Sequence, residues 1–247
     1  MSPETTRPET PAGAIDCPFF FEQGYMVCRD VIAPASVDRV ARFLRDEMAR
    51  LRNAGPETAQ DSQIQSGHFP LAARLSPALW DIPRDPTLRS LLLSALNSPD
   101  LLMHMPPTAR FVDPGHAPAA VPPHQDVSYN HHLSDFLTCW VPLVDIDADC
   151  GGVAVYEGTQ STTELLNDFS RELWLRPVDA DPATRVVCQP MRPGDVLLLN
   201  RWIVHESVPN RSSRTRLSID FRFFGAGSHS TKHHLDCQTW TVIAPKG

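Results

Sequence analysis

Two histidines and one aspartate have the residue types and order of a metal site. His124 and Asp126 are separated by a single residue. If they lie on a strand, both side chains leave the same face, because side chains alternate along a strand. A third ligand is available far downstream at His205, at the end of the strand-like run 197–204. Two imidazoles and one carboxylate on a β scaffold are the facial triad of non-haem Fe(II) oxygenases.

The segment after His205 supports the interpretation of these residues as a metal site. The chain has ten histidines, so one H-x-D spacing is weak evidence by itself. Residues 209–213 have turn composition, and residues 214–224 then alternate between apolar and polar. The polar side of that strand could face water. Alternatively, Arg216 could lie inside a barrel mouth and bind a ligand carboxylate through its planar guanidinium.

Strands dominate the part of the chain that carries these residues. The patterns predict strands over 136–146, 152–156, 195–204 and 216–224, and a possible short helix over 163–173. Earlier, hydrophobic periodicity predicts helices over 36–53, with Ser36 as N-cap, and over 86–96, with Asp85 as N-cap. Strands with this spacing indicate a mainly β sandwich or jelly roll with flanking helices.

Composition and charge argue against several classes of function. Lys and Arg number 22 against 29 Asp and Glu, a net charge of −7, which argues against a nucleic-acid partner. No segment has the roughly 20 apolar residues that span a membrane. The N-terminus lacks a secretory leader, so we expect a cytoplasmic protein. The six cysteines include no C-x-x-C pair. We expect a disordered tail over 1–14 and one domain over 15–247.

Several short motifs in this order resemble one family. They are His124-Gln125-Asp126, the segments 140–145, 151–155 and 193–198, His205-x-Ser207, Pro209-Asn210 and Arg216, with Phe21–Tyr25 before a helix. The chain is similar to the phytanoyl-CoA dioxygenase (PhyH-like) branch of the Fe(II)/2-oxoglutarate-dependent oxygenases. The resemblance implies a double-stranded β-helix core, a cupin-like jelly roll. It also implies Fe(II), with 2-oxoglutarate and O₂ as cosubstrates.

The resemblance also implies roles for individual residues. His124, Asp126 and His205 would bind iron and form the catalytic centre. The 2-oxoglutarate pocket would be formed by Arg216, Ser218, Ser207 and Trp140. Halogenating relatives replace the carboxylate ligand with a small residue, so Asp126 favours hydroxylation or a related oxidation. The expected reaction oxidises a small molecule, a natural-product intermediate or an amino-acid derivative, and converts 2-oxoglutarate to succinate.

Other residues leave alternatives open. Arg110, on a predicted strand, could anchor an anionic substrate or lie on the surface, and Tyr129 is a similar candidate. His229, His233 and His234 could form a second metal site, but a solvated loop is favoured because no ligand spacing supports zinc. Two other functions remain as alternatives. One is a catalytically inactive jelly-roll binding protein, and the other is a metal-dependent hydrolase that uses the same ligands.

Overall fold

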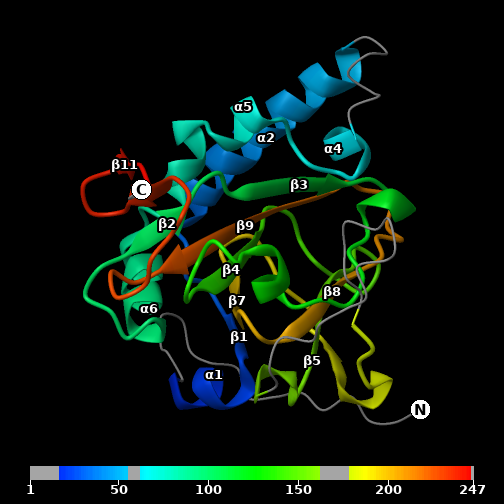
Figure 1. The fold of residues 1–247 in the computed structure, drawn as a ribbon. Coiled ribbons are helices and arrows are strands. Elements are labelled where there is room, and N and C mark those ends of the chain that lie inside the picture. The colour runs from blue at the N-terminus through cyan, green and yellow to red at the C-terminus, as the bar shows by residue number, and fades with distance from the viewer. Residues whose placement is uncertain (1–16, 55–61, 162–177, 246–247) are drawn as a thin grey trace.

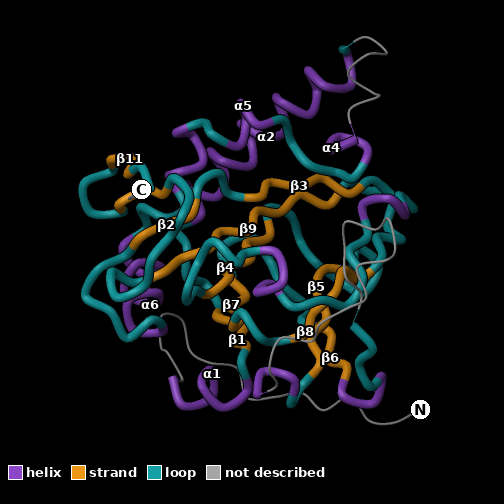
Figure 2. The backbone as a smooth tube through the Cα atoms, viewed as in Figure 1, coloured by secondary structure: helices purple, strands orange, loops and turns teal. Residues whose placement is uncertain are grey.

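Two antiparallel sheets form the centre of the molecule (Figures 1 and 2). The computed structural model describes residues 17–54, 62–161 and 178–245. The large sheet has the strand order β1 (Tyr25–Cys28), β7 (Val196–Asn200), β4 (Leu137–Pro142), β9 (Arg216–Phe224), β2 (Leu102–His104), β10 (His234–Asp236) and β11 (Thr241–Ile243), and β3 (Thr108–Val112) also pairs with β9. The small sheet has the order β6 (Arg185–Val187), β5 (Gly152–Tyr156) and β8 (Val204–Val208).

Helices cover one face of the large sheet. They are α1 (Cys17–Gln23), α2 (Pro34–Asn53), α5 (Leu71–Arg74) and α6 (Pro86–Ala95), which all contribute to the main core. A further one-turn helix, α4 (Ser62–Gln65), precedes α5 in the chain. One face of α2 is apolar at helical spacing and enters the main core together with α6 and the apolar side of β9. Because alternate residues of β9 are committed to this core, its remaining residues must face the opposite side of the sheet. That opposite side faces β5 and β8.

The structure confirms most of the predicted elements and corrects three details, one of which is that the predicted strand 136–146 is shorter, Leu137–Pro142. Strand 216–224 and strand 152–156 have the predicted bounds. The first long helix begins at Pro34, so Ser36 is not its N-cap. The predicted strand 195–204 is two elements, because a turn at 201–202 separates β7 from β8. That turn reverses the chain and moves His205 from the large sheet to the small one.

The described helices and strands do not test three of the predictions made from the sequence. The tail over 1–14 and the short helix over 163–173 lie outside the described residues, and a single domain over 15–247 stays a prediction. Among the described cysteines, Cys28, Cys139, Cys150, Cys188 and Cys237 are buried. In the described part of the chain, no helix is long and apolar enough to cross a membrane.

Asp85 caps α6, as predicted, and also accepts a hydrogen bond from the backbone just before α2. Its Oδ1 accepts hydrogen bonds from the backbone N–H groups of Thr87 (2.9 Å) and Leu88 (3.3 Å), and its Oδ2 accepts one from Ala33 (2.8 Å). We expect Asp85→Ala to lower the free energy of unfolding by about 2 kcal/mol, because the cap and a second buried acceptor are both lost. Urea unfolding measures this. Asp81→Ala, which removes a more exposed partner of Arg39, is the control and should cost less than about 1 kcal/mol.

Candidate active site

The two histidines of the predicted triad are joined by their backbones. His124 and His205 form an antiparallel bridge, and each N–H donates to the carbonyl of the other at 3.0 Å. Their rings lie 4.2 Å apart, centroid to centroid. Nδ1 of His124 lies 2.9 Å from the carbonyl of Pro122, and Nδ1 of His205 lies 3.1 Å from that of Ile203. These contacts assign the proton to Nδ1, so each Nε2 lone pair is available to a metal.

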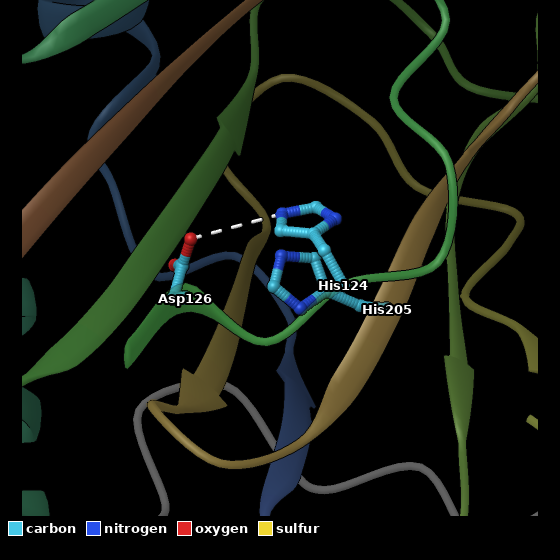
Figure 3. A group of neighbouring side chains, drawn as sticks. All are labelled: His124, Asp126 and His205. Atoms are coloured by element: carbon cyan, nitrogen blue, oxygen red, sulfur yellow. Dashed lines mark ion pairs between the residues drawn. The ribbon is translucent and has the colours of Figure 1, made fainter. Parts of the chain in front are cut away.

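Asp126 completes the group from a different kind of element. His124 and Asp126 do not share a strand, because Asp126 begins a short 3-10 helix, Asp126–Tyr129. Its carboxylate nevertheless faces the histidines, and Oδ1 lies 3.8 Å from Nε2 of His124 (Figure 3). One ligand atom from each of the three residues lies within 4.8 Å of the others. This donor set fits the two-histidine, one-carboxylate site of a non-haem iron.

The electrostatics keep His124 and Asp126 in the protonation states that bind metals. Burial lowers the pKa of the His124 imidazole to about 3, so this ring is neutral near pH 7. Burial alone would raise the pKa of Asp126. The charge of Arg222 opposes that effect most strongly, and the pKa of Asp126 falls well below its usual range. A neutral imidazole and an ionised carboxylate are the forms that coordinate a metal.

Arg216 presents half of its guanidinium to the cavity. The side chain is 4% exposed. Its Nη1 donates to the carbonyls of Gly152 (3.2 Å) and Val208 (2.9 Å). Its Nε is buried and has no hydrogen-bond partner among the described residues. Nε and Nη2 form one edge of the fork, and that edge is complementary to a carboxylate. Burial lowers the pKa of Arg216 to about 10, so it remains a cation at neutral pH.

All the site residues expected from the sequence line one cavity of about 540 Å³. They are His124, Asp126, His205, Arg216, Ser218, Ser207, Trp140, Arg110 and Tyr129. Arg216 and Ser218 come from the polar side of β9, Trp140 comes from β4, and Ser207 comes from β8. The cavity therefore lies between the two sheets, where both of their inner faces contribute polar side chains.

The polar residues of this cavity that sequence reasoning missed include Thr138, Asp220 and Arg222. Asp220 and Arg222 continue the alternation that begins with Arg216 and Ser218, so that pattern could have identified them. Thr138 had no comparable signal, because it lies in a strand that is buried along its whole length. Thr138 and Arg222 both contact the carboxylate of Asp126.

Arg110 lies on β3 and faces the cavity, so it is not a surface arginine. Its Nη2 donates to the carbonyls of Ser66 (3.1 Å) and Ala119 (2.6 Å). Its Nε is buried without a hydrogen-bond partner in the described ranges. Since Nη2 belongs to both edges of the fork, Arg110 retains single donors rather than a free two-pronged edge. Tyr129 contacts the ring of His124 edge-on, with centroids 5.5 Å apart.

The histidines near the C-terminus do not form a comparable group. In residues 17–54, 62–161 and 178–245, the triad is the only cluster of three His, Cys, Asp or Glu residues with metal-ligand spacing. Nδ1 of His234 lies 3.1 Å from the carbonyl of Lys232, and the ring of His234 packs on Phe224. His229 is exposed, and its backbone N–H donates to Ser134.

The buried imidazoles predict that the metal-free protein loses stability in mild acid. Burial lowers the pKa of His104 and His124 from 6.5 to about 3, and that of His132 to about 4. Between these values the unfolded chain binds more protons than the folded one, so stability falls as the pH drops below 6.5. Three such groups give a slope of up to roughly 4 kcal/mol per pH unit. Urea unfolding of chelator-treated protein at pH 7.5 and 5.5 measures this slope. His104→Gln should lower the slope by about a third, and equal stability at both pH values would contradict the prediction.

Comparison with known proteins identifies the family. The family model described as phytanoyl-CoA dioxygenase (PhyH) matches residues 20–218, most of the chain. The chain belongs to the phytanoyl-CoA dioxygenase family. It is therefore an enzyme of the iron- and 2-oxoglutarate-dependent oxygenase class, as the motifs predicted. A curated relative, 1-deoxypentalenic acid 11-beta-hydroxylase of Streptomyces exfoliatus, is 26% identical over 232 residues, which cover 85% of this chain and 81% of the relative.

Solved structures agree on the fold. The epimerase SnoN, in complex with Fe³⁺, alpha ketoglutarate and nogalamycin RO, superposes with a TM-score of 0.65 at 19% identity, covering 87% of this chain and 84% of SnoN. EvdO2 from Micromonospora carbonacea var. aurantiaca superposes with a TM-score of 0.66 at 21% identity, covering 90% of this chain and 95% of EvdO2. These likenesses confirm the predicted jelly-roll core with flanking helices.

Proposed function

We propose that this family member hydroxylates a natural-product intermediate that carries an acidic group, with conversion of 2-oxoglutarate to succinate. The observation that carries the proposal is the convergence of His124, Asp126, His205 and Arg216 on one cavity. Iron with 2-oxoglutarate, when bound, supplies the activation of O₂ and the oxidation of a C–H bond. The intact carboxylate of Asp126 favours hydroxylation over halogenation.

The protein's own residues bind and orient the reactants. Nε2 of His124, Nε2 of His205 and Oδ1 of Asp126 would hold the iron. The free edge of Arg216 would bind the distal carboxylate of 2-oxoglutarate by two parallel hydrogen bonds. Ser218 and Ser207 offer hydroxyl groups, and Trp140 offers an apolar wall that excludes water.

Charge supports an anionic substrate. With iron and 2-oxoglutarate bound, Arg216 would be matched by a carboxylate, and Arg222 is matched by Asp126. Arg110 then adds a half-buried cation with an unused buried Nε, near the buried carboxyl of Asp220. The relative from Streptomyces exfoliatus is named for an acid, 1-deoxypentalenic acid. We therefore propose that Arg110 binds a substrate carboxylate through single hydrogen bonds, with Tyr129 beside it.

Reconstitution tests the proposed reaction. The protein is loaded anaerobically with Fe(II) and 2-oxoglutarate, exposed to O₂ with terpenoid acids, and assayed for succinate and a hydroxylated product. The methyl esters of the same acids are matched substrates without the charge. We expect the acids to be turned over faster than their methyl esters. This difference in turnover should be smaller in Arg110→Met. Absence of both iron binding and succinate under all conditions would overturn the proposed function.

The same samples separate the two alternative functions. An inactive binding protein should not depend on the carboxylate of Asp126 for ligand binding, so titration of Asp126→Ala distinguishes it. A hydrolase that uses these ligands with zinc would turn over substrate without O₂. Metal analysis together with the O₂ dependence of product formation distinguishes it from an oxygenase. The cytoplasm stays the predicted compartment, and no nucleic-acid or membrane partner is expected.

A further inference from the structure

Both carboxylate oxygens of Asp126 are held by side chains that sequence analysis did not identify. The hydroxyl of Thr138 donates to Oδ2. Nη2 of Arg222 donates to Oδ1 at 3.1 Å. The Asp126 side chain is 1% exposed and that of Arg222 is 16% exposed, so the pair lies largely out of water. Asp126 is therefore fixed at both oxygens before any metal binds.

The two donors come from a rigid part of the fold. Thr138 on β4 and Arg222 on β9 are directly opposite in the strand register, so their side chains leave the same face of the sheet. Nη1 of Arg222 also donates to the hydroxyl of Thr108 on β3, at 2.9 Å. Three adjacent strands thus anchor the contacts to Asp126.

Asp126 needs such support more than the other two triad residues. The backbones of His124 and His205 brace each other through two hydrogen bonds. Asp126 lies outside any strand, at the start of a one-turn helix. Without side-chain contacts, rotation about its Cβ–Cγ bond would exchange the two oxygens. In the folded protein this rotation is opposed, because it would break the hydrogen bond to Thr138, the hydrogen bond to Arg222, or both.

We infer that Arg222 and Thr138 are positioning residues that present Oδ1 of Asp126 to the metal and hold Oδ2 away from it. Oδ1 is the oxygen that lies 3.8 Å from Nε2 of His124, and Oδ2 faces Thr138. The inference rests on the proposed metal-binding role of the triad. Outer partners of metal ligands typically change metal affinity 10- to 100-fold when they are removed.

A purely electrostatic role for Arg222 makes the opposite prediction. A cation that only repels the metal would weaken binding in the wild type. In that case Arg222→Met would tighten metal binding, and Arg222→Lys would leave it unchanged. A positioning role requires the planar fork that spans Thr108 and Asp126, which lysine cannot reproduce. Both Arg222→Met and Arg222→Lys should then weaken metal binding.

Anaerobic titration with Fe(II), and with Co(II) as a spectroscopic probe, tests the inference without a substrate. We expect Thr138→Val, Arg222→Met and Arg222→Lys each to weaken metal binding about 10- to 100-fold and to alter the Co(II) absorption, which reports coordination geometry. Thr138→Ser keeps the hydroxyl and should restore both. Thr215→Val is the matched control, because Thr215 also donates to an aspartate, Asp113, outside the cavity.

The outcomes separate this inference from the proposed function. If the wild type binds neither metal, the proposed function fails. If the wild type binds metal and Thr138→Val and Arg222→Lys match it within twofold with unchanged Co(II) spectra, the positioning role is overturned. Tighter binding by Arg222→Met also overturns it. Thermal unfolding identifies any variant that does not fold. If an Arg222 variant does not fold, Thr138→Val still tests the positioning role, because valine is nearly isosteric with threonine.

Discussion

Arg216→Met should strongly weaken 2-oxoglutarate binding while the protein still binds metal. The open edge of the guanidinium, Nε and Nη2, lies in a buried position where loss of one partner of a charged pair costs about 2–5 kcal/mol. This corresponds to a roughly 30- to 5000-fold weaker affinity. Metal affinity should change little, because Arg216 contacts the carbonyls of Gly152 and Val208 rather than the triad. Anaerobic titration of the Fe(II)-loaded protein with 2-oxoglutarate measures the first affinity, and titration of the metal-free protein with Fe(II) measures the second.

Two further variants define the role of the fork. Arg216→Lys keeps the charge but cannot form two parallel hydrogen bonds, so its affinity should lie between those of Arg216→Met and the wild type. Arg214→Met removes an arginine on the same segment whose partner, Asp147, lies outside the cavity, so 2-oxoglutarate affinity should not change. Wild-type affinity in Arg216→Met would show that another residue binds the cosubstrate carboxylate.

Asp126→Ala should lose metal binding and also destabilise the fold. Removing a ligand should weaken metal affinity by more than the 10- to 100-fold typical of an outer partner. The same substitution leaves the buried charge of Arg222 without its partner, and such a loss costs about 3–5 kcal/mol. Metal titration and urea unfolding measure the two effects separately.

A double variant separates ligation from charge compensation. In Asp126→Ala/Arg222→Met the unpaired cation is gone, so much of the stability should return, whereas metal binding should stay absent. Hydrophobic replacement of both partners of a buried ion pair is often neutral for stability. If the double variant is as unstable as Asp126→Ala, the lost stability has another cause. If it binds metal like the wild type, Asp126 is not a ligand.

Local pattern accounts for much of this fold. The alternation over 216–224 predicted β9 with its bounds, and Asp85 followed by Pro86 predicted the start of α6. These elements can be predicted because each depends on neighbouring residues and on the side-chain periodicity of a single helix or strand. The pattern misplaced the boundary at 195–204, where an apolar strand, a turn and a second strand follow each other without a break in hydrophobicity.

The site was predicted less completely than its scaffold. The motifs around His124, Asp126 and His205 predicted a metal site, and the structure brings these three side chains together. The family resemblance predicted a cosubstrate role for Arg216, which lines the same cavity. The same motifs did not reveal that Asp126 lies outside a strand, or which edge of Arg216 remains open. Nor could they show that carbonyls of Ser66 and Ala119 occupy Nη2 of Arg110.

By itself the sequence determined which residue types face which side of each strand, and therefore which polar groups could meet between the two sheets. The tertiary structure decided which of them do meet. Arg222 reaches Asp126 because the register of β4 against β9 places it opposite Thr138. Strand register across long loops depends on packing of the whole core, so no local pattern encodes it.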